Sequence, residues 1–465
     1  MHARDQVLIT AGDLAALVDS GRPVGVLDVR WSLAQPDGRA AYLEGHLPSA
    51  VYVSLEDDLS DHTIAGRGRH PLPCGRDLQA AARRWGVRRD VPVVVYNDWG
   101  RAGGSPARRR DVAARRPVCR GSTDVDGRDQ FWDAVGLDIF TEWKDGGTEL
   151  RWRSTTAANE GREVSVFTRR CGTPGAPALV LVHGFPTSSI DYFALTRELG
   201  GEFDIYTLDF PGYGLSDKPP EPYEYSLYDD ARLLVNAITE VWKLSDYRML
   251  THDRGSSVGM VAVGMLAALA QPAAPVDLIM TNANIFLPLS NLTVFQTALL
   301  NPETARATAA ATTPEALAAG MGFSTFIPRR TLDDPEIAAL AKCFAHNDGV
   351  RVLPDTIKYL NERADGETGW LEALSALDVN TTLVWGLHDN VAPLRVPNHV
   401  WHTYLKNKPG TNRYWVVPGA DHYVQCDAPA QVAEIVRLTA RGGDVSLQTL
   451  GNQPDGAVLV DTSDS

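Results

Sequence analysis

The sequence predicts an α/β protein with a small domain at the N-terminus and a larger domain built on a mostly parallel sheet. Two observations lead to this fold class. Short apolar runs that fit strands alternate with helical segments along most of the chain, an order typical of parallel sheets. A length of 465 residues exceeds what one compact domain usually holds, and a hydrophobic content of 44% is enough for ordinary cores.

Composition and charge argue against several classes of protein. The net charge of −14 argues against a surface for nucleic acid or for an anionic membrane. The five cysteines are scattered without a C-x-x-C pair, which predicts a reducing, cytoplasmic location and no metal site. The longest apolar run, residues 258–270, is too short to span a bilayer, so we expect no stable membrane insertion. We also expect no cofactor, and the sequence leaves the oligomeric state open.

Residues 1–100 are predicted to form the small domain. Its expected elements are a helix that includes 14–18, strands over 24–29, 51–53 and 91–96, and a helix over 78–85. Three segments in this region carry a resemblance: Leu27-Asp28-Val29-Arg30, Tyr42-Leu43-Glu44-Gly45-His46-Leu47-Pro48-Ser49-Ala50 and Gly68-Arg69-His70-Pro71-Leu72-Pro73. They resemble the first half of a tandem sulfurtransferase, so the domain is interpreted as rhodanese-like.

The rhodanese resemblance implies a cysteine thiolate that carries sulfur in the loop after the strand over 91–96. That loop reads Asn97-Asp98-Trp99-Gly100-Arg101 and has no cysteine. We therefore expect the rhodanese-like domain to be inactive. Residues 101–139 are interpreted as an Arg-rich irregular linker, in which Cys119 has no apolar strand leading into it.

Residues 140–440 are predicted to form the larger domain. Its expected strands cover 164–169, 178–182, 203–208, 247–251, 276–281, 381–385 and 413–417, with helices over 231–241 and 257–270. Helical pieces from about 287 to 380 interrupt the order of the strands, and we interpret them as a lid. The stretch 441–465 is rich in Gly, Asp and Ser, which predicts a disordered tail.

The stretch from Asp246 to Gly259 is central to the larger domain. It reads as a strand, a polar turn and an apolar helix, an arrangement that lifts one side chain above a sheet. Two residues compete for that position: Ser257 fits G-x-S-x-G, and Asp253 occupies the same kind of turn four residues earlier. With Ser257 at the turn, charged side chains would lie inside a buried strand, which is costly. The register therefore favours Asp253.

Asp253, Asp389 and His422 each follow a predicted strand, in the order nucleophile, acid, base. This is the order of an α/β-hydrolase triad, and the carboxyl ends of strands are where open sheets place their sites. Together with His183-Gly184-Phe185-Pro186, these residues make the region 140–440 resemble the epoxide hydrolase and haloalkane dehalogenase branch of the α/β-hydrolases. Within that branch the chain is similar to the mesoderm-specific-transcript-like proteins.

The resemblance implies a role for each site residue. Asp253 would be the nucleophile, His422 the base and Asp389 the residue that orients it. The backbone N–H groups of Phe185 and Arg254 would form an oxyanion hole. A carboxylate that attacks an sp³ carbon forms an alkyl ester, which water activated by the histidine then hydrolyses. The expected substrate is a small apolar molecule, together with water.

The leaving group is predicted from one lid segment. Tyr359-Leu360-Asn361-Glu362-Arg363 resembles the segment of epoxide hydrolases that holds one of two tyrosines donating to the epoxide oxygen. Tyr359 is therefore the expected donor, and hydrolysis of an epoxide to a diol is the preferred function. The second tyrosine has no counterpart between 285 and 358.

Three alternatives stay open. A haloalkane dehalogenase of this branch usually has Trp after the nucleophile and often Asn after His-Gly, where this chain has Arg254 and Phe185. An esterase with Ser257 as nucleophile is the second alternative. The third is a non-catalytic hydrolase-fold protein that uses its rhodanese-like half as a binding module.

Overall fold

The computed structural model describes residues 23–29, 37–47, 49–60, 81–87, 91, 93–96, 138–271, 273–442 and 456–463, together with Leu14, Leu17 and Ser20. The chain divides into two units, residues 1–123 with 451–456, and residues 124–450 with 457–465. The loop after Tyr96, Cys119 and nearly all of the predicted linker lie outside the described residues.

In its described part, the N-terminal unit contains a three-stranded parallel sheet with the order β2-β1-β3. The elements are β1 (Gly25–Asp28), α3 (Arg39–Glu44), β2 (Ala50–Tyr52) and β3 (Val93–Tyr96). Successive side chains of a strand point to opposite faces of its sheet. Val26 accordingly packs with Leu14 and Ala50, whereas Leu27 packs with Val53 in a second cluster. These strands confirm the α/β prediction for this region.

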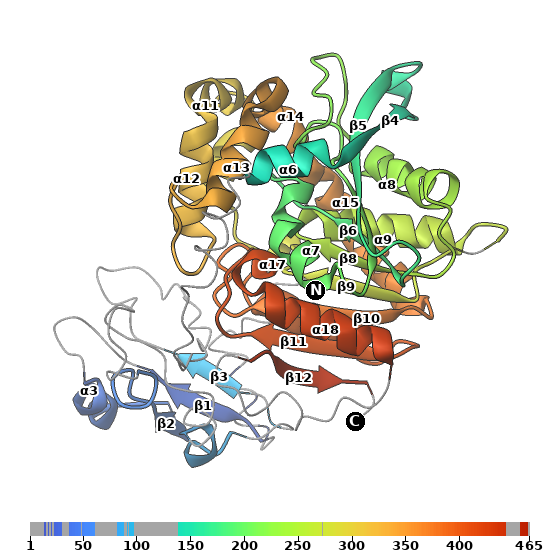
Figure 1. The fold of residues 1–465 in the computed structure, drawn as a ribbon. Coiled ribbons are helices and arrows are strands. Elements are labelled where there is room, and N and C mark those ends of the chain that lie inside the picture. The colour runs from blue at the N-terminus through green and yellow to red at the C-terminus, as the bar shows by residue number, and fades with distance from the viewer. Residues whose placement is uncertain are drawn as a thin grey trace. The chain divides into compact units, whose positions relative to one another are not determined.

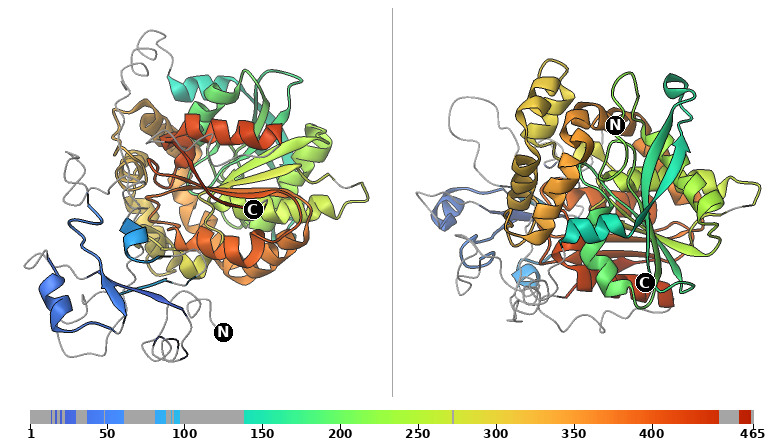
Figure 2. Two further views of the ribbon diagram at one scale, coloured as in Figure 1. Left: turned by 90° about the horizontal axis from the view of Figure 1, so that it is seen from below. Right: turned by 45° about the horizontal axis from the view of Figure 1, so that its top comes forward.

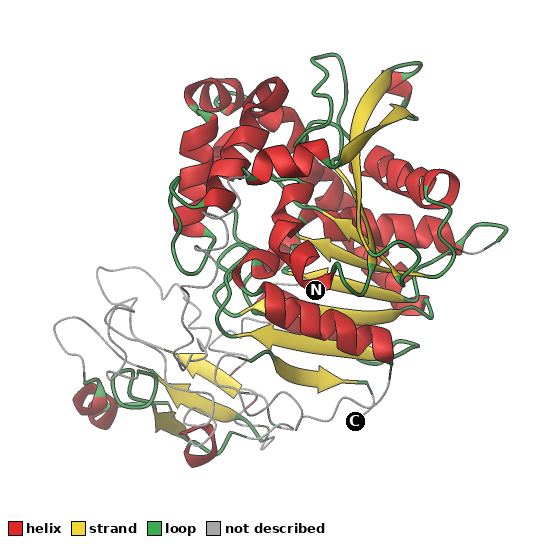
Figure 3. Ribbon diagram, in the orientation of Figure 1, coloured by secondary structure: helices red, strands yellow, loops and turns green. Residues whose placement is uncertain are grey.

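The larger unit is built on a nine-stranded sheet formed by described residues, with the order β12-β11-β10-β9-β8-β6-β7-β5-β4 (Figures 1 and 3). The strands are β4 (Gly147–Arg153), β5 (Glu163–Gly172), β6 (Ala178–Val182), β7 (Asp204–Leu208), β8 (Tyr247–His252), β9 (Asp277–Thr281), β10 (Asn380–Gly386), β11 (Asn412–Val417) and β12 (Val458–Thr462). Strands β6 to β11 run parallel, while β5 is antiparallel to β7 and β12 is antiparallel to β11.

Helices cover both faces of this sheet (Figure 2). Leu250 faces the cluster formed with α7 (Phe193–Leu199), α17 (Val424–Asp427) and α18 (Pro429–Arg441). The helices α8 (Leu227–Asn236), α9 (Arg254–Ala267) and α15 (Tyr359–Ala376) pack together on the other side. There Gly259 of α9 lies against Met249 and Thr251, the neighbours of Leu250 in β8. The parallel strands are therefore buried on both faces, which explains their nearly continuous apolar sequences.

The segment predicted as a lid is helical between β9 and β10. Its helices are α10 (Val294–Leu300), α11 (Ala305–Ala311), α12 (Pro314–Ser324), α13 (Pro335–Ala345), α14 (Leu353–Thr356) and α15. Thr313 and Asp334 cap α12 and α13 through their side chains, and a proline occupies the first turn of each helix. Figure 1 shows α11 to α14 grouped together. The remaining helices are α6 (Ile139–Asp145) and α16 (Arg395–Val400).

Two edge strands were not predicted from the sequence. Strand β4 pairs with β5, and β12 pairs with β11. The prediction of a disordered tail over 441–465 is therefore wrong for residues 458–462, which complete the sheet. Short antiparallel edge strands give a weak sequence signal, because one face of such a strand can be polar. In the described part of the chain, no helix combines the length and apolar character needed to cross a bilayer.

Candidate active site

Asp253 lies at a sharp turn between the end of β8 and the start of α9. Its φ of 45° and ψ of −119° are unusual for a residue with a side chain, and such strain costs about 1–3 kcal/mol. The neighbouring backbones are closely packed, since a Cβ on Gly255 would lie 2.4 Å from the carbonyl oxygens of Val182 and His183. The surrounding fold thus holds Asp253 at the apex, and the helix begins with Arg254 rather than three residues later as predicted.

Asp389 and His422 follow β10 and β11, and they meet at the same edge of the sheet. Nδ1 of His422 lies 2.9 Å from Oδ2 of Asp389. The same oxygen accepts a hydrogen bond from Nδ2 of Asn282 at 2.8 Å. The other oxygen accepts from the backbone N–H groups of Val391 and Ala392 at 2.7 and 2.9 Å. Asp389 is thereby fixed in position to orient the imidazole ring.

The charges of this pair are coupled. Burial alone would lower the pKa of His422, but the carboxylates of Asp389 and Asp253 outweigh it and raise that pKa to about 9. Burial opposes ionisation of Asp389, yet His422 and the hydrogen bonds to the carboxylate hold the pKa of Asp389 below its usual value. The two neighbouring aspartates therefore favour the protonated form of the His422 imidazole in the resting site. Nε2 of His422 lies 3.9 Å from Oδ1 of Asp253.

The two carboxylate oxygens of Asp253 have different surroundings. Oδ2 accepts a hydrogen bond from the backbone N–H of Phe185 at 3.0 Å, while Oδ1 faces His422. The N–H of Arg254, the second predicted donor, belongs to the first residue of α9, where backbone N–H groups lack intrahelical partners. A Cβ on Gly184 would lie 2.8 Å from Cβ of Asp253, so only glycine allows this close approach.

Tyr359 is the first residue of α15 and lies beside Phe185 and Arg254, the residue that follows Asp253. It is buried, and its ring centroid lies 5.6 Å from that of Phe185. Its hydroxyl is buried and has no hydrogen-bond partner among the described residues. Burial and the nearby Asp253 carboxylate raise the pKa of Tyr359, so the phenol keeps its proton. It can therefore donate to a group bound next to Asp253.

Three residues of this region were missed in the sequence. Asn282 follows β9 directly, so the rule that selected Asp389 and His422, a polar residue after a strand, would also have found it. Tyr213 lies in the loop after β7, outside the lid segment expected to hold a second tyrosine, and its ring centroid is 6.4 Å from that of Phe185. The third is Arg363, one helical turn after Tyr359.

Ser257 lies inside α9 and not at the turn. It is buried, and its hydroxyl accepts a hydrogen bond from Nε of Arg363 at 3.1 Å. No histidine of the described residues forms a hydrogen bond with this hydroxyl. A serine nucleophile needs an adjacent base, which this placement does not provide.

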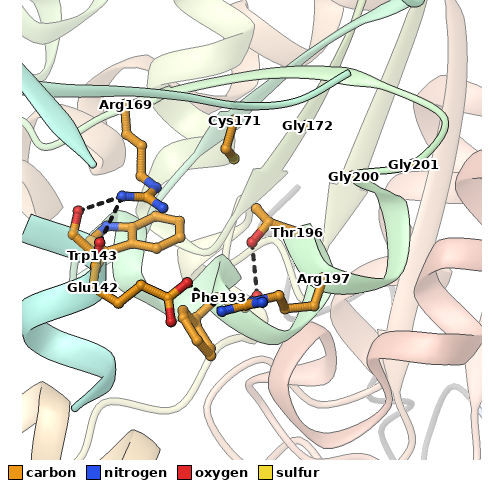
Figure 4. Close-up of a pocket in the computed structure, with 10 residues that line it drawn as sticks. All are labelled: Glu142, Trp143, Arg169, Cys171, Gly172, Phe193, Thr196, Arg197, Gly200 and Gly201. Carbon is orange, nitrogen blue, oxygen red and sulfur yellow. Dashed lines mark hydrogen bonds and ion pairs between the residues drawn. The ribbon is translucent and has the colours of Figure 1, made fainter. Parts of the chain in front are cut away.

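A pocket of about 280 Å³ lies away from these residues (Figure 4). Cys171 and Gly172 line the pocket and pair with the first residues of β7. Strands β7 and β8 run in the same direction, and Asp253 follows the last residue of β8. The pocket is therefore at the opposite end of the strands. The side chain of Arg169 also lines the pocket and donates to the carbonyl oxygens of Glu142 and Trp143 at 3.0 and 2.7 Å. None of the predicted site residues lines it.

Among the described residues, no group of three or more His, Cys, Asp or Glu side chains is arranged to hold a metal ion.

Comparison with known proteins agrees with this geometry. Residues 179–435 match the Alpha/beta hydrolase family. The chain belongs to the α/β-hydrolase family. This α/β-hydrolase is 32% identical over 304 residues to the putative hydrolase LipZ of Mycobacterium tuberculosis. The matched region covers 63% of this chain and 95% of LipZ. It is also 27% identical over 264 residues to the mesoderm-specific transcript homolog protein of Bos taurus, covering 56% of this chain and 77% of that protein.

The N-terminal unit of this α/β-hydrolase has different relatives. It is 69% identical over 107 residues to the putative thiosulfate sulfurtransferase SseB of Mycobacterium tuberculosis, over 23% of this chain and 38% of SseB. The chain thus spans little more than a third of the length of that relative. This similarity supports the rhodanese-like interpretation of the region.

Solved structures show the same fold for the larger unit. Haloalkane dehalogenase DbeA from Bradyrhizobium elkani is 18% identical, with a TM-score of 0.50 over 64% of this chain and 100% of DbeA. Cfl2 from Burkholderia cenocepacia is 17% identical, with a TM-score of 0.50 over 63% of this chain and 95% of Cfl2. At this identity the likeness concerns the fold alone.

Proposed function

We propose that the chain is a hydrolase that forms a covalent alkyl ester on Asp253, and that it converts an epoxide to a diol. The observation that carries this proposal is the placement of Asp253. One of its oxygens is held by the N–H of Phe185, and the other faces a His422 that is oriented by Asp389. A carboxylate nucleophile and a separate base for water are the two groups that this chemistry requires.

In the first step Oδ1 of Asp253 attacks a carbon of the epoxide ring. A bond forms between Oδ1 and this carbon, and the carbon–oxygen bond of the ring breaks with its electron pair moving to oxygen. The hydroxyl of Tyr359, which lacks a partner, donates to that oxygen as its negative charge develops. The oxygen takes the proton of the Tyr359 hydroxyl, so the product of this step is an ester between Asp253 and the substrate with one new alcohol, and Tyr359 is left as a phenolate.

In the second step water cleaves the ester. Esterification removes the negative charge of Asp253, which is one cause of the raised pKa of His422, so the imidazolium loses its proton more readily. That proton passes through solvent to the phenolate of Tyr359. Neutral His422 then takes a proton from water, and the oxygen of that water attacks Cγ of Asp253. The N–H groups of Phe185 and Arg254 stabilise the negative charge that develops on Oδ2. Collapse of this intermediate breaks the bond between Cγ and the substrate oxygen, which takes the proton from His422 and leaves as the diol. The acid proton left on Asp253 then passes to His422, which restores the carboxylate and the protonated imidazole.

The alternatives receive less support. The Ser257 hydroxyl is bonded by Arg363, so an esterase would lack a base at its nucleophile. A haloalkane dehalogenase of this branch usually carries Trp and Asn as halide donors, where this chain has Arg254 and Phe185. A panel of simple epoxides, haloalkanes and p-nitrophenyl esters, run with Asp253→Ala as control, tests the assignment. Turnover of the esters alone would contradict it.

Tyr359→Phe is expected to lower the rate of ester formation by about 100-fold, because the ring stays and the donor to the leaving oxygen is lost. The measurement is single-turnover formation of the adduct on Asp253. Tyr247→Phe is the matched control and should keep the wild-type rate, since Tyr247 is also buried but lies at the other end of β8, where its hydroxyl donates to the carbonyl oxygen of Ala273 at 2.9 Å. An unchanged rate in Tyr359→Phe would leave Tyr359 as a packing residue and would weaken the epoxide assignment.

We further propose that the N-terminal unit does not transfer sulfur. The sequence that follows β3 has no cysteine through Arg101, and a thiolate must carry the sulfur. Thiosulfate-to-cyanide transfer by the full chain is therefore expected at the level of a blank. A rate well above the blank that is lost in Cys119→Ala would show that Cys119 is an active-site cysteine.

A further inference from the structure

Arg363 is a buried cation with free hydrogen-bond donors. It lies on α15 one turn after Tyr359 and is fully buried. Its Nε donates to Ser257, while Nη1 and Nη2 have no hydrogen-bond partner among the described residues. A guanidinium group stays charged in a protein, so Arg363 cannot avoid this cost by losing a proton. Unpaired buried charges are strongly unfavourable and are rarely kept without a function.

Two glutamates near Arg363 in the sequence, Glu362 and Glu367, have other hydrogen-bond partners. The carboxylate of Glu362 accepts hydrogen bonds from the hydroxyl of Ser226 and the N–H of Leu227, both at 2.7 Å. Glu367, one turn after Arg363, accepts from the N–H of Leu287 at 2.8 Å. Burial raises the pKa of Glu367 to about 7, although the N–H of Leu287 and the charge of Arg363 act in the opposite direction. Among the described residues, no carboxylate forms an ion pair with Arg363.

Arg363 lies next to the proposed reaction centre. Its guanidinium carbon is 4.8 Å from the ring centroid of Tyr359, and that of Arg254 is 5.3 Å from the same ring. Arg254 donates to Asp230, but its Nε and Nη1 are also buried without a hydrogen-bond partner. Two guanidinium groups thus lie against the phenol whose free hydroxyl is close to Asp253. The expectation of an apolar substrate does not account for them.

We propose that Arg363 binds a carboxylate group of the substrate, so that the enzyme acts on epoxides that carry a carboxylate a few bonds from the ring. This inference rests on the proposed function. The free Nη1 and Nη2 form a planar fork that matches the two oxygens of a carboxylate. Because Arg363 lies against the Tyr359 ring, a carboxylate bound to it lies near the tyrosine proposed to donate to the epoxide oxygen. The positive charge also offsets the repulsion between an anionic substrate and the Asp253 carboxylate.

The first test compares substrates that differ only in charge. The probes are oxirane-2-carboxylate and 3,4-epoxybutanoate, each paired with its carboxamide, and the readout is the ratio of kcat/KM for acid and amide. We expect the wild type to prefer the acids. Arg363→Met should reduce the ratio on the order of 100-fold, mainly through KM, and Arg363→Lys should restore part of it.

Arg248→Met is the matched control for this test. Arg248 is also largely buried, but it forms an ion pair with Asp277 at 3.0 Å at the start of the strands, away from Asp253. We expect Arg248→Met to keep the acid-to-amide ratio of the wild type. A ratio that is unchanged in Arg363→Met would overturn the inference, and an equal fall of the ratio in both variants would do the same.

The second test does not depend on turnover. Sodium butanoate should raise the Tm of the wild type, and neither butanamide nor sodium chloride at the same concentration should do so. Arg363→Met should lose this stabilisation, yet its own Tm should exceed that of the wild type, because an unpaired buried charge is removed. A merely structural Arg363 predicts the opposite, a lower Tm with the butanoate effect retained, which would contradict the inference.

The two tests separate the anion site from the proposed function. Stabilisation by butanoate that depends on Arg363, without turnover of any epoxide, would support the carboxylate site and reject the epoxide hydrolase assignment. Turnover of epoxides without a preference for acids and without stabilisation by butanoate would reject the carboxylate site and leave the proposed function in place.

Discussion

Asp253→Ala is expected to reduce epoxide turnover by on the order of 10⁴-fold or more, because the carboxylate that forms the ester is removed. A single turnover of the wild type in ¹⁸O-water, with enzyme in excess, tests the mechanism directly. If Asp253 attacks first, the new oxygen of the diol comes from its carboxylate and water refills the carboxylate. The label should then appear in the peptide that contains Asp253 and not in the product.

Direct attack by water would give the reverse pattern, with label in the product at once. The control for the substitution is Asp246→Ala, since Asp246 is exposed just before the other end of the same strand. We expect this variant to keep wild-type turnover. Label found in the product alone would reject Asp253 as the nucleophile, even if Asp253→Ala were inactive, because a base at this position would also be essential.

His422→Gln should form the ester at an appreciable rate but hydrolyse it very slowly, so that the adduct accumulates on the Asp253 peptide. The imidazole acts only after the carboxylate has attacked, as the base for water, and glutamine cannot take that proton. Mass spectrometry of quenched samples should therefore show the mass of the substrate added to this peptide. His399→Gln is the control, because His399 packs against Phe286 and makes no contact with the triad.

The hydrolysis step should also depend on pH in a defined direction. Water is activated by neutral imidazole, so the decay rate of the wild-type adduct should rise with pH and then level off. The apparent pKa of this rise should lie below about 9, the pKa of His422 in the resting enzyme, because the ester no longer carries the charge of Asp253. A decay rate that does not change with pH, or an adduct missing from His422→Gln, would argue against His422 as the base.

The sequence by itself determined the features that depend on local patterns. Strands β6 to β11 were predicted because parallel strands buried on both faces need continuous apolar runs. The same rule identified the register at Asp253, since the polar residues around it could not belong to such a strand. The proline and capping residues that begin α12 and α13 are local signals of the same kind.

Only the tertiary structure decided the features that depend on which distant segments meet. Strand β12 forms by pairing with β11, and a short strand with mixed polarity does not indicate that partner. Asn282 can donate a hydrogen bond to Asp389 because β9 lies beside β10 in the sheet. The state of Arg363 depends on contacts between segments far apart in the chain. Leu287 and Ser226 already donate to the neighbouring carboxylates, and Ser257 is the hydrogen-bond partner of Arg363 itself. Burial and pairing of a charge are properties of the packed interior, where water no longer supplies the missing partner.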